Sequence, residues 1–392
     1  MPRNLPALYL FVFVLMFAIG MASPLTPLYA SSLGASWTEI GLMGTGWAAA
    51  LMLLAVLTGK LSDKFGRKPI LICSGLLSAI AAGIYLFSKS VVLLIGVRVL
   101  EGAAWAFFWP AIEAMATEQV GPTRTGHVIG IVTALYGIGS ALGATVGGAV
   151  VASLGYSLMF LIYLTLAIGS VVVAVFLLPE PNHVLETKSD DYLGISERLI
   201  TRKTTLAYFL GASYTFGLGL MLSLFPVFAK VLGIQVLLIG ILFGLFWTGR
   251  ITVSYVGGNL SDKYGRRALA VSAMIGSFLG FASIAISGSL YQLALGATIV
   301  GASVGAAFPA GVTLISDEVP GRLRGYAMGI FETSCAVGFL VSSTTGGLLA
   351  DLFSPRIPYI LGVFVSLTAA IVLLIGLRDM RTAKNRESFS SL

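Results

Sequence analysis

The stretch GKLSDKFGRK, residues 59–68, is a short charged segment between two long apolar ones, and five of its ten residues carry a charge. Nearly the same string, GNLSDKYGRR, returns at residues 258–267. The two copies lie 199 residues apart, which is about half the chain. A charged string that recurs at half the chain length predicts a duplicated unit.

Composition predicts that the chain lies in a membrane. Of its 392 residues, 57% are hydrophobic and only 10% are charged. Ordinary soluble domains carry about 25% charged residues, so this chain has too little charge to cover a surface exposed to water. Its apolar runs are about 20 residues long, the length of a helix that crosses a bilayer. The sequence therefore predicts an all-α integral membrane protein.

The apolar runs divide into twelve expected membrane helices. They lie at residues 5–30, 36–60, 67–87, 90–118, 123–152, 155–178, 204–230, 235–260, 266–287, 289–317, 322–351 and 354–378. We expect an N-terminal six-helix bundle over residues 1–178 and a C-terminal six-helix bundle over 204–378. A cytoplasmic linker at 179–203 joins them, and a cytoplasmic tail follows at 379–392.

The two halves overlay at the offset of 199 without gaps. Matching pairs include Tyr9–Tyr208, Pro27–Pro226, Gly34–Gly233, Gly41–Gly240, Pro110–Pro309, Gly130–Gly329 and Gly148–Gly347. Because six is an even number of helices, both copies enter the membrane from the same side, as in a parallel repeat. Two such pseudo-symmetric bundles suit alternating access, in which a cavity between the halves opens first to one side and then to the other.

The basic residues predict the orientation of the chain. If both termini lie on one side, that side collects most of the 24 Lys and Arg residues, and the loops of the other side hold only Lys89, Lys230 and Arg356. By the positive-inside rule, both termini and both charged strings then face the cytoplasm. We expect a multi-pass protein of the plasma or inner membrane. The net charge of +7 reflects this topology, and no nucleic-acid partner is expected.

The sequence predicts no cofactor and no enzymatic chemistry. Cys73 and Cys335 fall in separate apolar runs, and the chain has only two histidines, so we expect no metal site. There is no G-x-x-x-x-G-K-[ST] loop that could bind nucleotide phosphates. Energy for transport is therefore expected to come from an ion gradient, with protons as the partner ion.

The pattern G-x-L-x-D-K-x-G-R-[KR], after the second helix of each half, resembles the signature loop of the major facilitator superfamily. The resemblance covers the whole chain, and it implies a monomeric transporter of small molecules. Residues 143–148, GATVGG, are similar to the G-P-x-x-G-G motif of antiporters in this superfamily, except that Ala144 replaces the proline. Plain close packing of helices is the alternative explanation for these glycines.

The glycines of the signature strings have expected structural roles. Gly59 and its copy Gly258 are expected to let a helix pack closely on a neighbour. Gly66 and its copy Gly265 are expected to allow a tight turn, with a positive φ angle where needed.

The charged residues of the strings are expected to form a cytoplasmic gate. The resemblance implies that Asp63 latches the second helix to the eleventh and that Arg67 pairs with Glu118. The second half repeats this set, and the two expected triads are Asp63–Arg67–Glu118 and Asp262–Arg266–Asp317. Anchoring by the positive-inside rule alone is the alternative, but it does not explain the repeated acids.

Polar and aromatic side chains share one face of the fourth helix. They are Arg98, Glu101, Trp105, Trp109, Ile112 and Glu113. Because the fourth helix lines the cavity in the family, we expect this face to contact substrate, with aromatic rings that hold a flat or cationic solute. A structural ion pair between Arg98 and Glu101 is an equally good interpretation.

Three acids are candidates for carrying the proton. A charged side chain at a helix centre costs about 2.5–3.5 kcal/mol on insertion scales, so each one needs a reason. Glu113 has no basic residue one turn away, and Glu332 has no charged counterpart in the first half. These two lead, and Glu101 is the third. Arg250 also breaks the repeat and is a candidate cavity residue; an Arg250–Glu332 ion pair is the alternative for both.

Three tyrosines could add hydroxyl groups to the cavity: Tyr136 on the fifth helix, and Tyr208 and Tyr214 on the seventh. Packing in the core is the alternative role for them.

Two functional hypotheses follow for the whole chain. The first is proton-coupled efflux of amphipathic, drug-like molecules, as in the antiporter branch of the family. The second is proton-coupled transport of one metabolite, such as a sugar or an organic anion. A lipid-handling or sensor protein on the same scaffold is a weaker third.

Overall fold

The computed structural model describes residues 5–120, 125–179, 199–320 and 323–377. The side chains of residues 56, 126 and 257–264 also lie outside this description, as do most of the predicted linker and the predicted tail.

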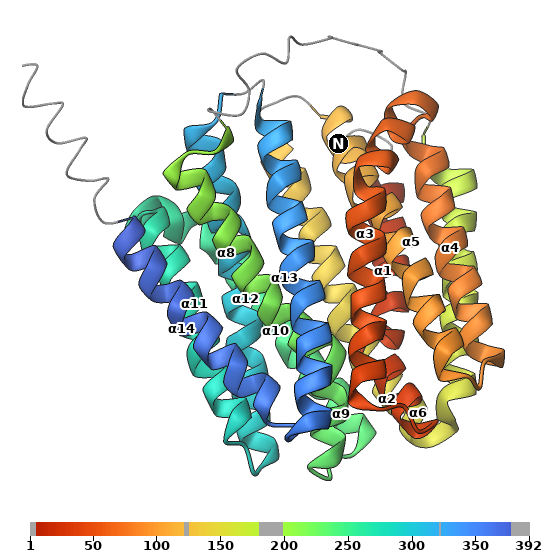
Figure 1. The fold of residues 1–392 in the computed structure, drawn as a ribbon. Coiled ribbons are helices and arrows are strands. Elements are labelled where there is room, and N and C mark those ends of the chain that lie inside the picture. Colours follow the sequence, from red (N-terminus) through yellow and green to blue (C-terminus); the bar gives the residue numbers. More distant parts are fainter. Residues whose placement is uncertain (1–4, 121–124, 180–198, 321–322, 378–392) are drawn as a thin grey trace, which may run out of the picture.

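Every regular element in the described ranges is a helix (Figure 1). In chain order they are α1 (Leu5–Ala22), α2 (Leu25–Ser32), α3 (Trp37–Phe65), α4 (Arg67–Phe87), α5 (Val91–Glu118), α6 (Thr125–Leu177), α8 (Arg202–Gly219), the π-helix η1 (Leu220–Leu224), α9 (Phe225–Val231), α10 (Val236–Tyr264), α11 (Arg266–Ala285), α12 (Leu290–Glu318), α13 (Arg324–Leu352) and α14 (Ile357–Gly376).

These elements give the twelve predicted membrane passes. The first is α1 with α2, and the seventh is α8 with η1 and α9. The fifth and sixth run together as α6, which is interrupted at Gly155 where φ is 85°. Within the described ranges, eleven continuous stretches are long and apolar enough to cross a membrane; the number is eleven and not twelve because α6 holds two passes in one stretch.

The first and seventh passes are broken at equivalent places, which the sequence ranges did not predict. Pro24 precedes α2, and Pro226 stands in the first turn of α9 directly after η1. A proline has no N–H and clashes with the carbonyl of the preceding turn, so the chain breaks or widens there.

The repeat is visible in the backbone as well as in the sequence. Gly66 and Gly265 turn the chain from α3 to α4 and from α10 to α11, with φ of 96° and 85°. Gly34 and Gly233 form a second pair at the same offset, with φ of 90° and 82°. A side chain at these angles would be strained, so the expectation of a turn that requires glycine at Gly66 and Gly265 is confirmed.

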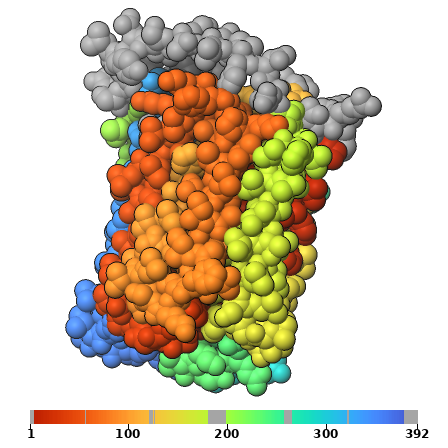
Figure 2. All heavy atoms as spheres, turned by 90° about the vertical axis from the view of Figure 1, so that its right-hand side faces the viewer, coloured from red at the N-terminus to blue at the C-terminus, as the bar shows by residue number. Residues whose placement is uncertain are grey.

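The two halves lie side by side (Figure 1). The contacts between them are made mainly by α3 with α13 and by α6 with α10, and α2 also packs on α9. The outer face of the first half is formed by α4 and the later part of α6, coloured orange and yellow-green in Figure 2.

One end of the bundle carries residues 59–68 and 258–267, and we name it the motif end; the other is the far end. At the far end the halves are in backbone contact. A Cβ atom placed on Gly41 of α3 would lie 3.2 Å from the Cα of Gly347 on α13. A Cβ atom on Gly148 of α6 would lie 3.0 Å from the Cα of Gly240 on α10.

The same helix faces are open at the motif end. Gly59, Gly130 and Gly329 lie 18 residues along the helix from Gly41, Gly148 and Gly347, respectively. Eighteen residues are five helical turns, so each pair lies on the same helix face. Among the described residues, nothing lies within 4 Å of a Cβ atom placed on any of the three. The expectation that Gly59 packs closely on a neighbour is thus wrong for this conformation. The halves meet at the far end and separate towards the motif end.

Candidate functional site

The first signature string ends in an ion-pair triad within the first half. Arg67, at the start of α4, places Nη1 2.6 Å from Oδ1 of Asp63 at the end of α3. Its Nε lies 3.0 Å from Oε1 of Glu118 at the end of α5. The structure therefore brings together the three residues that the sequence predicted to be partners. Within the described residues, the polar contact of Asp63 is with Arg67 and not with α13, so the latch stays a prediction.

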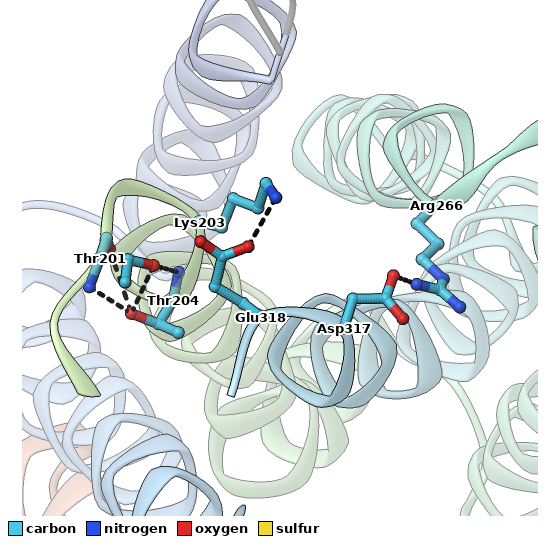
Figure 3. A network of polar contacts seen from close by, with 6 residues as sticks. All are labelled: Thr201, Lys203, Thr204, Arg266, Asp317 and Glu318. Atoms are coloured by element: carbon cyan, nitrogen blue, oxygen red, sulfur yellow. Dashed lines mark hydrogen bonds and ion pairs between the residues drawn. The ribbon is translucent and has the colours of Figure 1, made fainter. Parts of the chain in front are cut away.

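The second half repeats part of this arrangement. Arg266 of α11 pairs with Asp317 near the end of α12 (Figure 3). The side chain of Asp262 and the surroundings of Gly258 lie outside the described residues.

A neighbouring ion pair was not predicted. Nζ of Lys203, in the first turn of α8, lies 2.5 Å from Oε2 of Glu318 (Figure 3). Thr201 caps the same helix through Thr204 (Figure 3). The signal available in the sequence was a lysine beside the start of the seventh helix and a second acid after Asp317.

Arg98 and Glu101 form a buried pair inside the first half. Nη1 of Arg98 lies 2.6 Å from Oε2 of Glu101, and both side chains are 8% exposed. The hydroxyls of Tyr85 on α4 and Tyr163 on α6 donate to the same carboxylate at 3.0 and 3.3 Å. The expectation that Arg98 and Glu101 line the space between the halves is wrong, because their partners all belong to the first half. The structural alternative fits this geometry.

Four aromatic rings from both halves gather where α5, α6 and α10 approach one another. We name them the aromatic group: Trp105, Trp109, Tyr136 and Trp247. Trp105 and Trp109 are nearly parallel, with 6° between their planes and 6.0 Å between ring centroids. Tyr136 lies 5.5 Å from Trp105 and meets Trp247 edge-on at 4.9 Å. The sequence predicted the first three residues and missed Trp247, one turn before Arg250.

Arg250 of α10 lies against this group. Its guanidinium carbon is 4.9 Å from the ring centroid of Trp247 and 5.3 Å from that of Tyr136. Nη1 donates to the Tyr136 hydroxyl at 3.4 Å, which joins the two halves. The alternative Arg250–Glu332 ion pair is not formed among the described residues, where Arg250 has no acidic partner.

Glu113 and Glu332 are acids of different halves that lie near one another. Glu113 lies on α5 and Glu332 on α13, and their carboxyl groups are close enough for their charges to interact. Glu113 stands one turn after Trp109 on α5, which places it next to the aromatic group. Glu332 is exposed although it lies within an apolar pass. An acid in such a place needs either a counter-charge or a proton.

Two of the predicted cavity tyrosines are engaged within the second half. The hydroxyl of Tyr208 donates to the carbonyl of Leu199 at 3.1 Å, just before α8. The buried hydroxyl of Tyr214 lies 3.5 Å from Sγ of Cys335 on α13. The structure thus gives Tyr208 a contact at the motif end and Tyr214 a place in the core of the second half.

The far end has a polar contact between the halves that the sequence did not reveal. Asp351, at the end of α13, accepts hydrogen bonds from the N–H of Trp37 at 3.0 Å and the N–H of Thr38 at 2.7 Å. The Thr38 hydroxyl adds a third at 2.6 Å. These N–H groups open α3 and have no partner within the helix, so the carboxylate caps it.

Comparison with protein families and relatives gives a consistent assignment. The model of the Major Facilitator Superfamily matches residues 8–249 and 207–391. An uncharacterized MFS-type transporter of Methanocaldococcus jannaschii is 24% identical over 382 residues, covering 94% of this chain and 97% of that protein. Multidrug resistance protein 2 of Bacillus subtilis is 24% identical over 368 residues, covering 90% of each.

The fold is found in solved structures. The crystal structure of a mutant of the nucleoside transporter NupG superposes with a TM-score of 0.81 at 14% identity, covering 96% of this chain and 100% of that chain.

Proposed function

We propose a function from one premise: this chain belongs to the Major Facilitator Superfamily. It is therefore a multi-pass membrane transporter of small molecules. We infer further that it works by alternating access and exports amphipathic, drug-like molecules in exchange for protons. Relatives at 24% identity that include Multidrug resistance protein 2 support the choice of this branch.

The observation that carries the proposal is the set of side chains that both halves present to one another. The first half contributes Trp109 and Glu113, and the second contributes Arg250 and Glu332. Rings bind apolar and flat solutes, while charged groups within apolar passes mark substrate or ion pathways. Because the site is built from both halves, their relative movement would change it.

The separation of the halves supports alternating access. Backbone contact at the far end and open glycine faces at the motif end fit a carrier that is open to one side. The positive-inside rule places the motif end in the cytoplasm, so we assign this conformation as inward-facing in a plasma or inner membrane. One chain supplies both halves, and a monomer is therefore sufficient for the cycle.

Glu113 and Glu332 are the proposed proton carriers. They lie on helices of different halves without a basic partner among the described residues, and Glu113 stands one turn from Trp109 of the aromatic group. A substrate at the rings and a proton at the acids would then be bound in neighbouring places, so that one can influence the other.

The test is a flux assay in liposomes that contain the purified protein and an internal pH dye. We expect tetraphenylphosphonium or a neutral amphipathic drug to trigger proton movement, and Glu113→Gln or Glu332→Gln to reduce it. Glu318→Gln, which removes an acid paired with Lys203, is the matched control and should transport normally. Proton movement with only one sugar or one aliphatic acid, or normal coupling in both variants, would overturn the proposal.

A further inference from the structure

Arg250 differs from the other arginine that lies deep in an apolar pass. Arg98 has the carboxylate of Glu101 at 2.6 Å. Arg250 has only the rings of Tyr136 and Trp247 and one tyrosine hydroxyl at 3.4 Å. Among the described residues, no acid neutralises it. A guanidinium in such surroundings keeps its charge, so its position calls for an anionic partner.

The contacts of Arg250 indicate which anionic group it would bind. The side chain is half-buried on α10 and touches α6 of the other half. Its guanidinium lies over the rings of Trp247 and Tyr136, and among the described residues its hydrogen-bond partner is the Tyr136 hydroxyl, while an arginine has five N–H donors. A planar fork of this kind matches a carboxylate with two parallel hydrogen bonds.

The aromatic group next to Arg250 favours a flat molecule. Tyr136 contacts Trp105, Trp109 and Trp247, so the rings continue from the guanidinium across to α5. The two α5 indoles are almost parallel, which suits offset stacking of a planar ring along them. An aliphatic acid would gain the charge contact but not the stacking.

We propose that the transporter recognises flat aromatic acids, with the acid group on Arg250 and the ring against Trp105, Trp109 and Tyr136. This inference rests on the proposed transport function and narrows its substrate class. It assigns the specificity for an anionic group to one residue. Glu113 and Glu332 stay free for protons, because the anion is held at a different helix.

Binding of three matched probes to the purified protein tests the inference. They are 2-naphthoate, its methyl ester and cyclohexanecarboxylate, measured by isothermal titration calorimetry at one pH and ionic strength. We expect 2-naphthoate to bind about tenfold or more tightly than either of the other probes. The ester lacks the charge-assisted contact with Arg250, and a tenfold difference in affinity is the size of one such contact. Cyclohexanecarboxylate lacks the aromatic ring that stacks on the indoles. Equal binding of the acid and the ester by the unaltered protein would overturn the inference without any variant.

Substitution of Arg250 then locates the effect. In Arg250→Gln, the advantage of the acid over the ester should disappear while binding of the ester is retained. Arg250→Lys should keep part of the advantage of the acid over the ester, since an ammonium carries the charge but lacks the planar pair of N–H donors of a guanidinium. Arg356→Gln is the control, because Arg356 donates to the carbonyls of Ala285 and Ser287 at the far end. An unchanged preference for the acid in a folded Arg250→Gln protein would overturn the assignment.

The proposed substrate class and the proposed transport function can fail independently, and the experiments distinguish the two failures. If protons move with amphipathic cations but the acid has no advantage, only the substrate class is wrong. If 2-naphthoate binds through Arg250 but no solute moves protons, proton-coupled efflux is wrong and the binding site stands.

Discussion

The carboxylate of Asp351 accepts a hydrogen bond from the backbone N–H of Thr38 at 2.7 Å, and these residues belong to different halves of the protein. Asp351 ends α13, whereas Thr38 stands in the first turn of α3. The contact holds the far end closed at the place where the glycine faces touch. Opening of the far end has to break it, because α3 and α13 would move apart.

Removal of this carboxylate should loosen the far end. In Asp351→Ala, the first N–H groups of α3 lose their cap, which typically costs about 1 kcal/mol. We expect about a fivefold rise in the labelling rate of a cysteine at Thr344, which lies between the halves and contacts Thr45 at 2.6 Å. The measurement uses a membrane-impermeant thiol reagent on protein with Cys73 and Cys335 replaced by alanine. An unchanged labelling rate would show that Asp351 does not hold the far end closed.

The open glycines at the motif end predict a contact of the other conformation. If the halves close there as they do at the far end, Gly59 on α3 and Gly329 on α13 come together. Gly59→Leu should therefore fold normally but reduce transport at least about tenfold, because a side chain blocks closure without meeting an obstacle in the present conformation. Gly83→Leu, at an equally open glycine of α4, is the control. Full transport by Gly59→Leu would refute close packing at this site.

The triad at the first signature string should matter more for transport than for stability. The side chain of Asp63 is 69% exposed, and exposed ion pairs contribute about 0–1 kcal/mol. Asp63→Asn is expected to lower the free energy of unfolding by less than about 1 kcal/mol and to reduce the transport rate clearly. Transport and thermal unfolding of the same preparation check both statements. A variant that transports normally would leave Asp63 with only an anchoring role.

The buried Arg98–Glu101 pair should behave in the opposite way. Glu101→Gln leaves the guanidinium buried without a counter-charge, and breaking such a pair costs about 3–5 kcal/mol. We expect a large fall in the free energy of unfolding in detergent. Replacing both residues, as Arg98→Met with Glu101→Gln, should restore part of it, because no unpaired charge remains. A Glu101→Gln protein as stable as the unaltered one would contradict the structural role.

Sequence reasoning captured what depends on local pattern and on the repeat. Apolar runs gave the twelve passes, and the offset of 199 identified Gly66 and Gly265 as equivalent turns, which the φ angles confirm. The resemblance to the signature loop also implied that Arg67 pairs with Glu118, and the two side chains meet where α4 begins and α5 ends.

The remaining features depend on how helices rotate against one another, which helical periodicity alone does not determine. Periodicity put Arg98 on the same face as Trp105, yet packing of α4 and α6 buried Arg98. Trp105 instead contacts Tyr136, whose ring meets Trp247 of the other half. The contact of Asp351 with Thr38 joins positions more than 300 residues apart and has no counterpart in the repeat, so no local pattern indicated it.

Distances at both ends of the same molecule test alternating access most directly. Spin labels at Pro69 and Ala268 would report the motif end, and labels at Lys89 and Ile286 the far end, by double electron–electron resonance in lipid nanodiscs. Between the unaltered protein and Asp351→Ala, the account predicts that the motif-end distance shortens while the far-end distance lengthens. Distances that stay fixed, or that change in the same direction at both ends, would contradict it.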